Sequence, residues 1–269
     1  MVRRLHQTDR MTNSFERLLA LAADPNLIPG VYNYCDGRCP RCPFNERCLS
    51  FLDARDLEAQ QLEQPVPAAS TTIERSLQRT IGFLHEVAEQ EGFDLSTAIP
   101  AAHAPAVDLP DDPRNPLVAR ALEYAGMTYP VMQALEPILA LRSDASLTAA
   151  ADTIGWFSTL IGSKISRAIT SRADGWDNPD DRQSDANGSA KVARLSIAES
   201  RLAWQVLMEA GKATADGVPA RAERMLEELD VLLAERFPLA MAFVRPGFDE
   251  PAVAAGAQTT LPPCAPRGT

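Results

Sequence analysis

Four cysteines lie close together near the start of the chain: Cys35, Cys39, Cys42 and Cys48. Their segment reads YNYCDGRCPRCPFNERC and has the spacing C-x3-C-x2-C-x5-C. Thiolates bind soft and borderline metals, and four of them complete either a tetrahedral zinc site or an iron–sulfur cluster. Four bare thiolates this close would repel one another and would be open to oxidation. The spacing therefore predicts that the four cysteines hold one metal centre.

The spacing favours an iron–sulfur cluster over zinc. Structural zinc sites usually place roughly a dozen or more residues between two short cysteine pairs, whereas five residues separate Cys42 from Cys48. Zinc draws its sulfurs to about 2.3 Å from one atom, while a four-iron cluster spreads its cysteines over separate corners. Pro40 and Pro43 each follow a cysteine and restrict the backbone there. We expect a [4Fe-4S] cluster, with zinc as the alternative and free structural thiols as the third reading.

Part of the cysteine segment resembles the cysteine clasp of iron–sulfur helicase–nuclease proteins. The likeness consists of the spacing C-x2-C-x5-C from Cys39 to Cys48, with Pro43 and Phe44 inside it, and it covers ten residues. In that group one cluster ligand lies far away in the sequence, whereas Cys35 is adjacent here, and no acidic nuclease core accompanies the motif. The resemblance therefore implies the type of cluster and not a nuclease activity.

The first three cysteines also match the three-cysteine signature of radical S-adenosylmethionine enzymes. Those enzymes leave the fourth iron open for their cofactor, whereas Cys48 is close enough here to occupy that corner. They also need a barrel of alternating strands and helices, and the sequence shows no alternating strand pattern. Position 41, which is often aromatic in that signature, is Arg41. We therefore reject this interpretation.

Taken whole, the chain resembles a family of uncharacterised bacterial all-helical proteins with an N-terminal YNYCDxxCxRCPFxxRC motif. The resemblance rests on the cysteine segment, on the later stretch QSDANGSAKVA and on the closing FVRPGFDE. It spans most of residues 15–250. It implies a cysteine site within one integrated domain, and it implies no known activity.

The composition predicts a helical protein with an acidic surface. Of the 269 residues, 45% are hydrophobic and only 6% are aromatic, and the apolar set is dominated by Ala and Leu, which favour helices. The net charge of −10 disfavours contacts with nucleic acid or with an anionic membrane surface. We therefore expect an unknown protein or small-molecule partner, with no nucleic acid and no membrane.

The sequence also predicts a cytoplasmic location. No stretch approaches the roughly 20 apolar residues that span a bilayer, and the basic, polar start at residues 1–12 lacks the apolar core of a secretory signal. Disulfides are rare in the cytosol, which strengthens the metal interpretation of the cysteine cluster. The fifth cysteine, Cys264, lies far from the other four in the sequence, and we interpret it as an incidental free thiol.

The apolar periodicity predicts an all-α protein, an antiparallel helical bundle with an N-terminal cysteine-rich metal-binding loop. Residues 1–62 would contain a first helix, the metal-binding loop and a charged helix, residues 70–237 the bundle, and residues 238–269 a loosely ordered tail. Gly155 and Gly162 lie seven residues apart in one helix and would let a neighbouring helix approach closely. The helices are expected at residues 13–23, 45–62, 72–91, 116–127, 129–142, 147–172, 189–210 and 218–236.

The helical body holds weaker candidates for a second site, and the sequence identifies no catalytic residue. Glu199 falls on an apolar stripe of the helix 189–210, and a buried carboxylate is costly unless paired and is often functional. Asp185 and Lys191 flank the start of that helix, whose backbone amides could hold an anion. A site near Glu199, Trp204 and Lys191 is one interpretation; helix caps and an ordinary ion pair are the other.

Three functions stay open at this point. The first is an iron–sulfur protein whose cluster has a redox, sensing or structural role. The second is a structural-zinc protein that presents a helical face to a partner. The third is an enzyme with a site between the helices near Glu199, so the sequence leaves enzyme activity undecided. His85 and Glu89 are expected to form only a surface ion pair, because the paired Glu-x-x-His pattern of di-iron bundles is missing.

Overall fold

All regular secondary structure is helical in the part of the chain that the structure, a computed structural model, describes: residues 17–62, 69–94, 115–141, 144–173, 181–211 and 217–249. No β-strand occurs in those residues, which confirms the expected all-α class. Besides the helical residues 17–22, the α-helices are α2 (Leu49–Leu62), α3 (Ala69–Gln90), α5 (Pro116–Ala140), α6 (Ala145–Ala173), α7 (Asp185–Glu209) and α8 (Val218–Arg236). The short 3-10 helices are η1 (Val31–Asn33), η2 (Cys39–Arg41), η3 (Asn45–Arg47) and η4 (Ala240–Ala242). Within the described ranges, none of the helices has both the length and the apolar character that a bilayer crossing requires.

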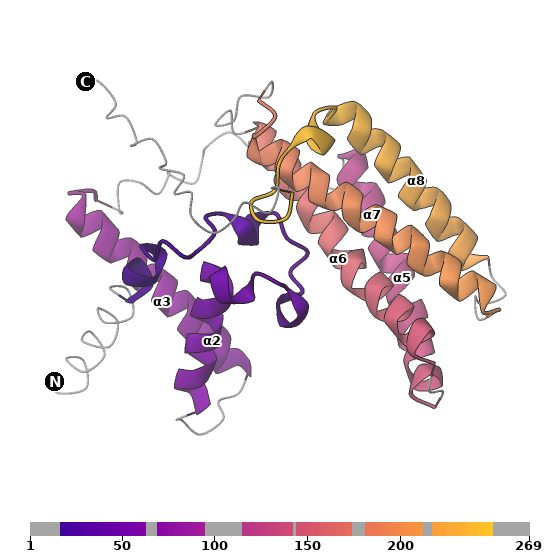
Figure 1. Cartoon of the computed structure of the whole chain (residues 1–269), viewed down its shortest axis with the longest axis horizontal. Coiled ribbons are helices and arrows are strands. Elements are labelled where there is room, and N and C mark those ends of the chain that lie inside the picture. The colour runs from indigo at the N-terminus through magenta and orange to yellow at the C-terminus, as the bar shows by residue number, and fades with distance from the viewer. Residues whose placement is uncertain are drawn as a thin grey trace.

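The helices form two groups, with the cysteine segment between them. Figure 1 shows α5, α6, α7 and α8 packed side by side in one group and α2 and α3 in the other. The indigo segment that carries the four cysteines lies between the two groups (Figure 1). The bundle of α5 to α8 is therefore the body against which the cysteine segment can be held.

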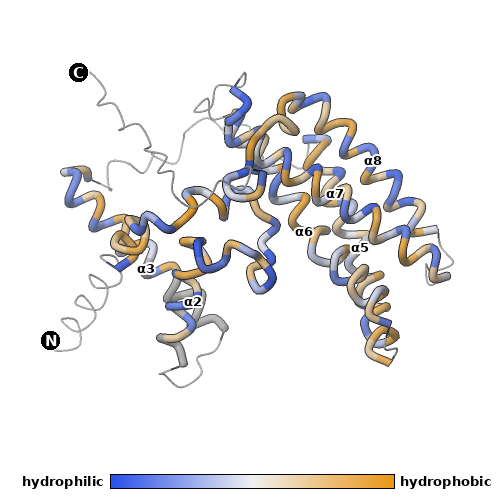
Figure 2. The backbone as a smooth tube through the Cα atoms, viewed as in Figure 1, coloured by the Kyte–Doolittle hydropathy of each residue, from blue (hydrophilic) through white to orange (hydrophobic). Residues whose placement is uncertain are grey.

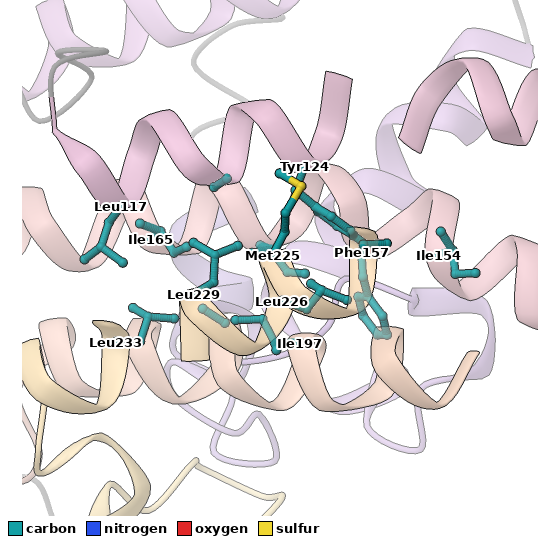
Figure 3. Close-up of a cluster of buried hydrophobic side chains, with 14 of the residues drawn as sticks. Leu117, Tyr124, Ile154, Phe157, Ile165, Ile197, Met225, Leu226, Leu229 and Leu233 are labelled. Carbon is teal, nitrogen blue, oxygen red and sulfur yellow. The ribbon is translucent and has the colours of Figure 1, made fainter. Parts of the chain in front are cut away.

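Helices α5 to α8 enclose the hydrophobic core. Apolar residues recur along these helices at intervals of three and four residues, which places them on one face, and Figure 2 shows hydrophobic and hydrophilic residues mixed along each helix. Burial of each large apolar side chain stabilises the fold by roughly 1.5–3 kcal/mol. Figure 3 shows the side chains that meet between the four helices: Leu117, Tyr124, Ile154, Phe157, Ile165, Ile197, Met225, Leu226, Leu229 and Leu233.

Helix α5 is one continuous helix, whereas the sequence indicated two helices that meet at Thr128. Thr128 is buried within α5, and its hydroxyl donates to the backbone oxygen of Tyr124 at 2.7 Å. Pro130 and Pro137 lie inside α5 without ending it. The buried face of the helix continues beyond Pro130 to Leu135, which is 5% exposed. Core packing on both sides of the prolines therefore outweighs the backbone hydrogen bonds that they remove.

The two glycines of α6 face α5, but an added Cβ at either position would make only an ordinary van der Waals contact, so the helix approach does not depend on glycine. A Cβ atom on Gly155 would lie 3.8 Å from Met132 Cγ, and one on Gly162 would lie 3.9 Å from Ala121 Cβ, both on α5.

Helix α8 begins and ends at the predicted residues 218 and 236. Helix α7 begins at Asp185, four residues earlier than predicted, so the stretch that we considered as an anion-binding entry is already helical.

Residues 237–249 pack against the bundle, which corrects the prediction of a loosely ordered tail from residue 238 onward. This stretch has no helical periodicity over a useful length, so its burial leaves little trace in the sequence. Three of its apolar side chains are nevertheless at most 2% exposed: Phe237, Ala240 and Phe243. Residues 250–269, and Cys264 with them, lie outside the described residues.

The apolar stripe predicted for the helix 72–91 lies on α3 but is largely exposed. Its members Leu77, Ile81 and Leu84 are 58%, 53% and 48% exposed, and Ala88 is buried. His85 and Glu89 are exposed on the same helix. Periodicity alone therefore identified the helix without showing what its apolar face contacts.

Candidate metal centre

The four cysteines lie in an irregular segment that is built from the three short helices η1, η2 and η3. Gly30 and Gly37 both have φ 73°, a left-handed conformation that glycine adopts at little cost. Cys48 is buried and the other three cysteines are half-buried. Cys48 is an extended residue between η3 and α2, with φ −115° and ψ 114°, and not a residue of the first turn of a helix as the sequence indicated.

The thiols lie within electrostatic range of one another. Cys39 interacts with the thiols of all three other cysteines, and Cys35 interacts with Cys48. Burial raises the pKa of the Cys39 thiol, and its three neighbours raise it further. Burial also raises the pKa of the Cys35 thiol. Both thiols are therefore protonated at neutral pH without a cation, and metal binding would release their protons.

In the described part of the chain, no group of three or more His, Cys, Asp or Glu side chains is placed so that it could hold one metal ion. The four cysteines lie together in one loop segment.

Backbone amides of the loop are directed at the sulfur atoms. The Phe44 N–H donates to Cys42 Sγ at 3.4 Å. A backbone hydrogen bond from Gly37 opposes the rise in the pKa of Cys35. Amide hydrogen bonds to thiolates stabilise their negative charge and tune a metal centre that they hold. The loop therefore supplies part of the environment that metal-bound thiolates require.

Helix α6 holds the first half of the cysteine loop. Arg38 is 8% exposed, and its Nη1 donates to Asp152 Oδ2 at 2.7 Å. Its guanidinium carbon lies 5.7 Å from the centroid of the Trp156 ring. The Trp156 indole N–H in turn donates to the Asp36 backbone oxygen at 2.7 Å. These contacts fix the stretch between Cys35 and Cys39.

Replacing Gly37 with alanine is expected to lower the free energy of unfolding by about 1–2 kcal/mol, because alanine is strained at φ 73°. The new Cβ would also lie 3.3 Å from Trp156 Cζ2 and press on the ring that holds the loop. Urea unfolding measures the loss. Gly92→Ala is the matched control, because Gly92 has φ 67° with no atom within 4 Å of the added Cβ. An equal loss in both variants would contradict a role for the Trp156 contact.

Two cations of α6 contact the loop at Asn33, just before Cys35. Lys164 Nζ donates to the Asn33 backbone oxygen at 2.7 Å. Arg167 Nη1 donates to Asn33 Oδ1 at 3.2 Å. These bonds hold η1 against α6 and place positive charge beside the first cysteine.

The start of α7 holds Tyr34, the residue before Cys35. The Tyr34 hydroxyl donates to Asp185 Oδ1 at 2.9 Å, and Arg167 Nη2 donates to the same oxygen at 2.6 Å. Burial alone would raise the pKa of Asp185, but the hydrogen bonds from Arg167 and Tyr34 outweigh it and lower the pKa. The Tyr34 ring also packs on the Phe243 ring, with a centroid distance of 4.5 Å. Gly188 lies directly beneath the two rings, because a Cβ there would come within 2.4 Å of Tyr34 and 2.7 Å of Phe243.

The segment 243–249 completes the support of the loop. The Phe248 ring meets the Phe44 ring edge to face at 4.9 Å between centroids. Lys191 Nζ on α7 donates to the Phe243 backbone oxygen at 2.6 Å and to Asp249 Oδ2 at 2.7 Å. The cysteine segment, the start of α7 and residues 243–249 are far apart in the sequence, yet they form one contiguous set of contacts. These are the three stretches, YNYCDGRCPRCPFNERC, QSDANGSAKVA and FVRPGFDE, that stand out in the sequence.

Comparisons with protein-family models, with curated proteins and with solved structures find no match to this chain. The interpretation of the site therefore rests on the residues themselves.

The residues of the possible second site do not form one group. Asp185 is bound by Tyr34 and Arg167, and Lys191 is 8% exposed and tied to residues 243–249. Glu199 is exposed on α7, within electrostatic range of Asp36, Arg38 and Arg245. Partial burial of the Glu199 carboxyl is the main reason that its pKa is raised. Asp185 and Lys191 thus support the cysteine loop, and Glu199 lies beside that support.

Sequence reasoning missed the α6 residues that hold the loop. Asp152, Trp156, Lys164 and Arg167 are spaced by four, eight and three residues, so they follow one face of a helix. A polar and aromatic stripe opposite the apolar one was the available signal. The stripe by itself does not predict that the cysteine loop packs against it.

Asp249→Asn is expected to lower the free energy of unfolding at pH 7 by about 2 kcal/mol, because buried Lys191 loses its ionic partner. Burial alone would raise the pKa of Asp249, but hydrogen bonds from Arg245 and Lys191 outweigh it and hold the pKa far below its ordinary value. A carboxyl whose pKa is lower in the folded state stabilises the protein above the unfolded-state pKa of about 3.9. This stabilisation is lost as the pH falls through the lowered folded-state pKa. Urea unfolding at several pH values should therefore show the wild type and the variant converging below pH ~4. A difference that does not depend on pH would contradict the ionic role.

Proposed function

We propose that Cys35, Cys39, Cys42 and Cys48 hold a [4Fe-4S] cluster in a cytoplasmic helical protein, with a redox, sensing or structural role. The observation that carries the proposal is the gathering of four thiols, all in mutual electrostatic range of Cys39, in one loop fixed to a helical bundle. We take the consecutive helices of that bundle to run antiparallel. When bound, the cluster would supply electron transfer or a structural cross-link through the metal.

The donor set fits a four-iron cluster in three respects. It offers four thiols in one loop. Backbone amides point at two of the sulfurs. Three of the cysteines are half-buried and one is buried, so the loop shields the sulfurs partly from water. Solvent exposure is one of the factors that would set the potential of a cluster bound there.

Structural zinc is the second candidate, and the extensive anchoring of the loop is the observation that favours it. The loop joins α6, α7 and residues 243–249, which is what a metal that serves only folding would stabilise. The interval of only five residues between Cys42 and Cys48 argues for the larger core. With either iron or zinc, the four cysteines would bind the metal and the helices would hold the loop in place.

Iron, sulfide and zinc analysis of protein purified without oxygen, together with its absorption spectrum, tests the proposal. We expect about four iron and four sulfide per chain, as the cluster type requires, in a brown protein with broad absorption in the visible range. A colourless protein with one zinc and no iron would replace the cluster by the zinc site. Colourless protein without either metal, from cells grown with both metals, would refute both.

A further inference from the structure

Lys164 combines partial burial with the absence of a salt bridge among the described residues. Arg47, beside Cys48, also forms no salt bridge there, but it is exposed and water screens its charge. Arg38 pairs with Asp152, and Arg167 pairs with Asp185. Within the described residues, Lys164 makes no salt bridge, and its ammonium donates to the Asn33 backbone oxygen at 2.7 Å. The side chain is half-buried. An ammonium that loses much of its hydration is costly unless an anion lies nearby.

Cys35, which would be a thiolate when it binds a metal, is a candidate for that anion because its charge acts on Lys164. Asn33 lies two residues before Cys35, so the hydrogen bond to its backbone oxygen brings the ammonium to the first cysteine of the motif. Burial lowers the pKa of Lys164, and the charge of Cys35 is the largest opposing influence. Lys164 in turn opposes the rise in the pKa of the Cys35 thiol. The two groups thus stabilise each other's charged form.

We propose that Lys164 is the positioning residue that sets the reduction potential of the centre held by the four cysteines, by placing an unpaired positive charge beside Cys35. The inference rests on the proposed [4Fe-4S] function and deepens it. A cluster bound by four thiolates is anionic and gains one more negative charge on reduction. A fixed cation at short range stabilises the reduced form more than the oxidised form, so it raises the potential. Asp152 pairs with Arg38 and Asp185 pairs with Arg167, whereas Arg41 and Arg47 are exposed and screened by water. Lys164 is therefore the half-buried cation whose charge no salt bridge offsets among the described residues.

Reduction potentials of the full-length, cluster-containing protein test this role. Lys164→Gln keeps a hydrogen-bond donor and removes the charge, and we expect a potential lower by about 59 mV, which is tenfold in the one-electron reduction equilibrium. Lys164→Arg keeps the charge and should restore most of the wild-type value. Arg224→Gln, which removes an exposed charge on α8, is the matched control and should leave the potential unchanged.

The outcomes separate the two proposals. If the wild type holds no iron, the cluster function fails and this role fails with it. If Lys164→Gln holds its iron with a wild-type potential, the role of Lys164 is overturned while the cluster function stands. If Lys164→Gln loses its iron while its circular dichroism stays helical, retention of iron in Lys164→Arg supports a role for the positive charge at this position. Loss of iron in both variants would show that the lysine acts only as a structural anchor, against the proposal.

Discussion

Replacing Cys39 with serine is expected to abolish iron binding while leaving the helical bundle folded. Cys39 is the thiol that interacts with all three of the others, so its loss removes the central ligand of the set. A serine hydroxyl does not ionise near neutral pH and is a poor substitute for a soft thiolate ligand. Cys39 is half-buried in η2, outside the core between α5 and α8, so circular dichroism should show the wild-type helix content.

Cys264→Ser is the matched control for this substitution. It makes the same chemical change in the only cysteine outside the motif. The control should keep the full iron content and colour, whereas Cys39→Ser should keep less than about a tenth of the iron, in line with the loss of an obligatory ligand. Full iron content in Cys39→Ser would contradict the assignment of the motif as the ligand set. Loss of iron in the control alone would transfer the ligand role to Cys264.

Replacing Gly188 with alanine is expected to lower the free energy of unfolding by about 3 kcal/mol, at the upper end of the range for overpacking. The added Cβ would lie 2.4 Å from Tyr34 Cε1 and 2.7 Å from Phe243 Cζ. Neither ring can retreat easily, because Tyr34 is also bound to Asp185 and Phe243 is 2% exposed. The substitution therefore forces the cysteine loop and residues 243–249 away from α7.

Gly126→Ala supplies the control for the backbone effect of a glycine-to-alanine change. Gly126 also lies within a helix, and no atom lies within 4 Å of its added Cβ. Alanine favours a helix over glycine by about 1 kcal/mol, so this variant should match or exceed the wild type in stability. Thermal unfolding of the two variants measures the contrast. A Gly188→Ala protein as stable as the wild type would show that α7 and the loop are not in contact as described.

Helices with an unbroken apolar period could be predicted from the sequence, whereas the helix that contains prolines could not. Helix α8 has its predicted bounds because its apolar pattern is unbroken between Gly217 and Arg236. Helix α5 was divided wrongly because proline chemistry is local, whereas the packing that carries the helix past Pro130 depends on residues of other helices. The burial of residues 237–249 was missed for the same reason, since Phe243 is buried by Tyr34 and the start of α7.

The candidate site could likewise be predicted only in part. Ligand type and spacing are local properties, so the four cysteines could be named from the sequence, and their joint metal binding is still a prediction. The residues that hold the loop come from distant parts of the chain, and only the fold brings Trp156 and Lys164 to it. Glu199, chosen for its place on an apolar stripe, turned out to be exposed beside the loop.

An anomalous difference map at the iron absorption edge, from crystals grown without oxygen, tests the central claim most directly. We predict one compact group of iron peaks enclosed by the sulfur atoms of Cys35, Cys39, Cys42 and Cys48, with no second iron position in the bundle. A single peak that persists at the zinc edge and vanishes at the iron edge, or iron bound anywhere other than among these four sulfurs, would contradict the account.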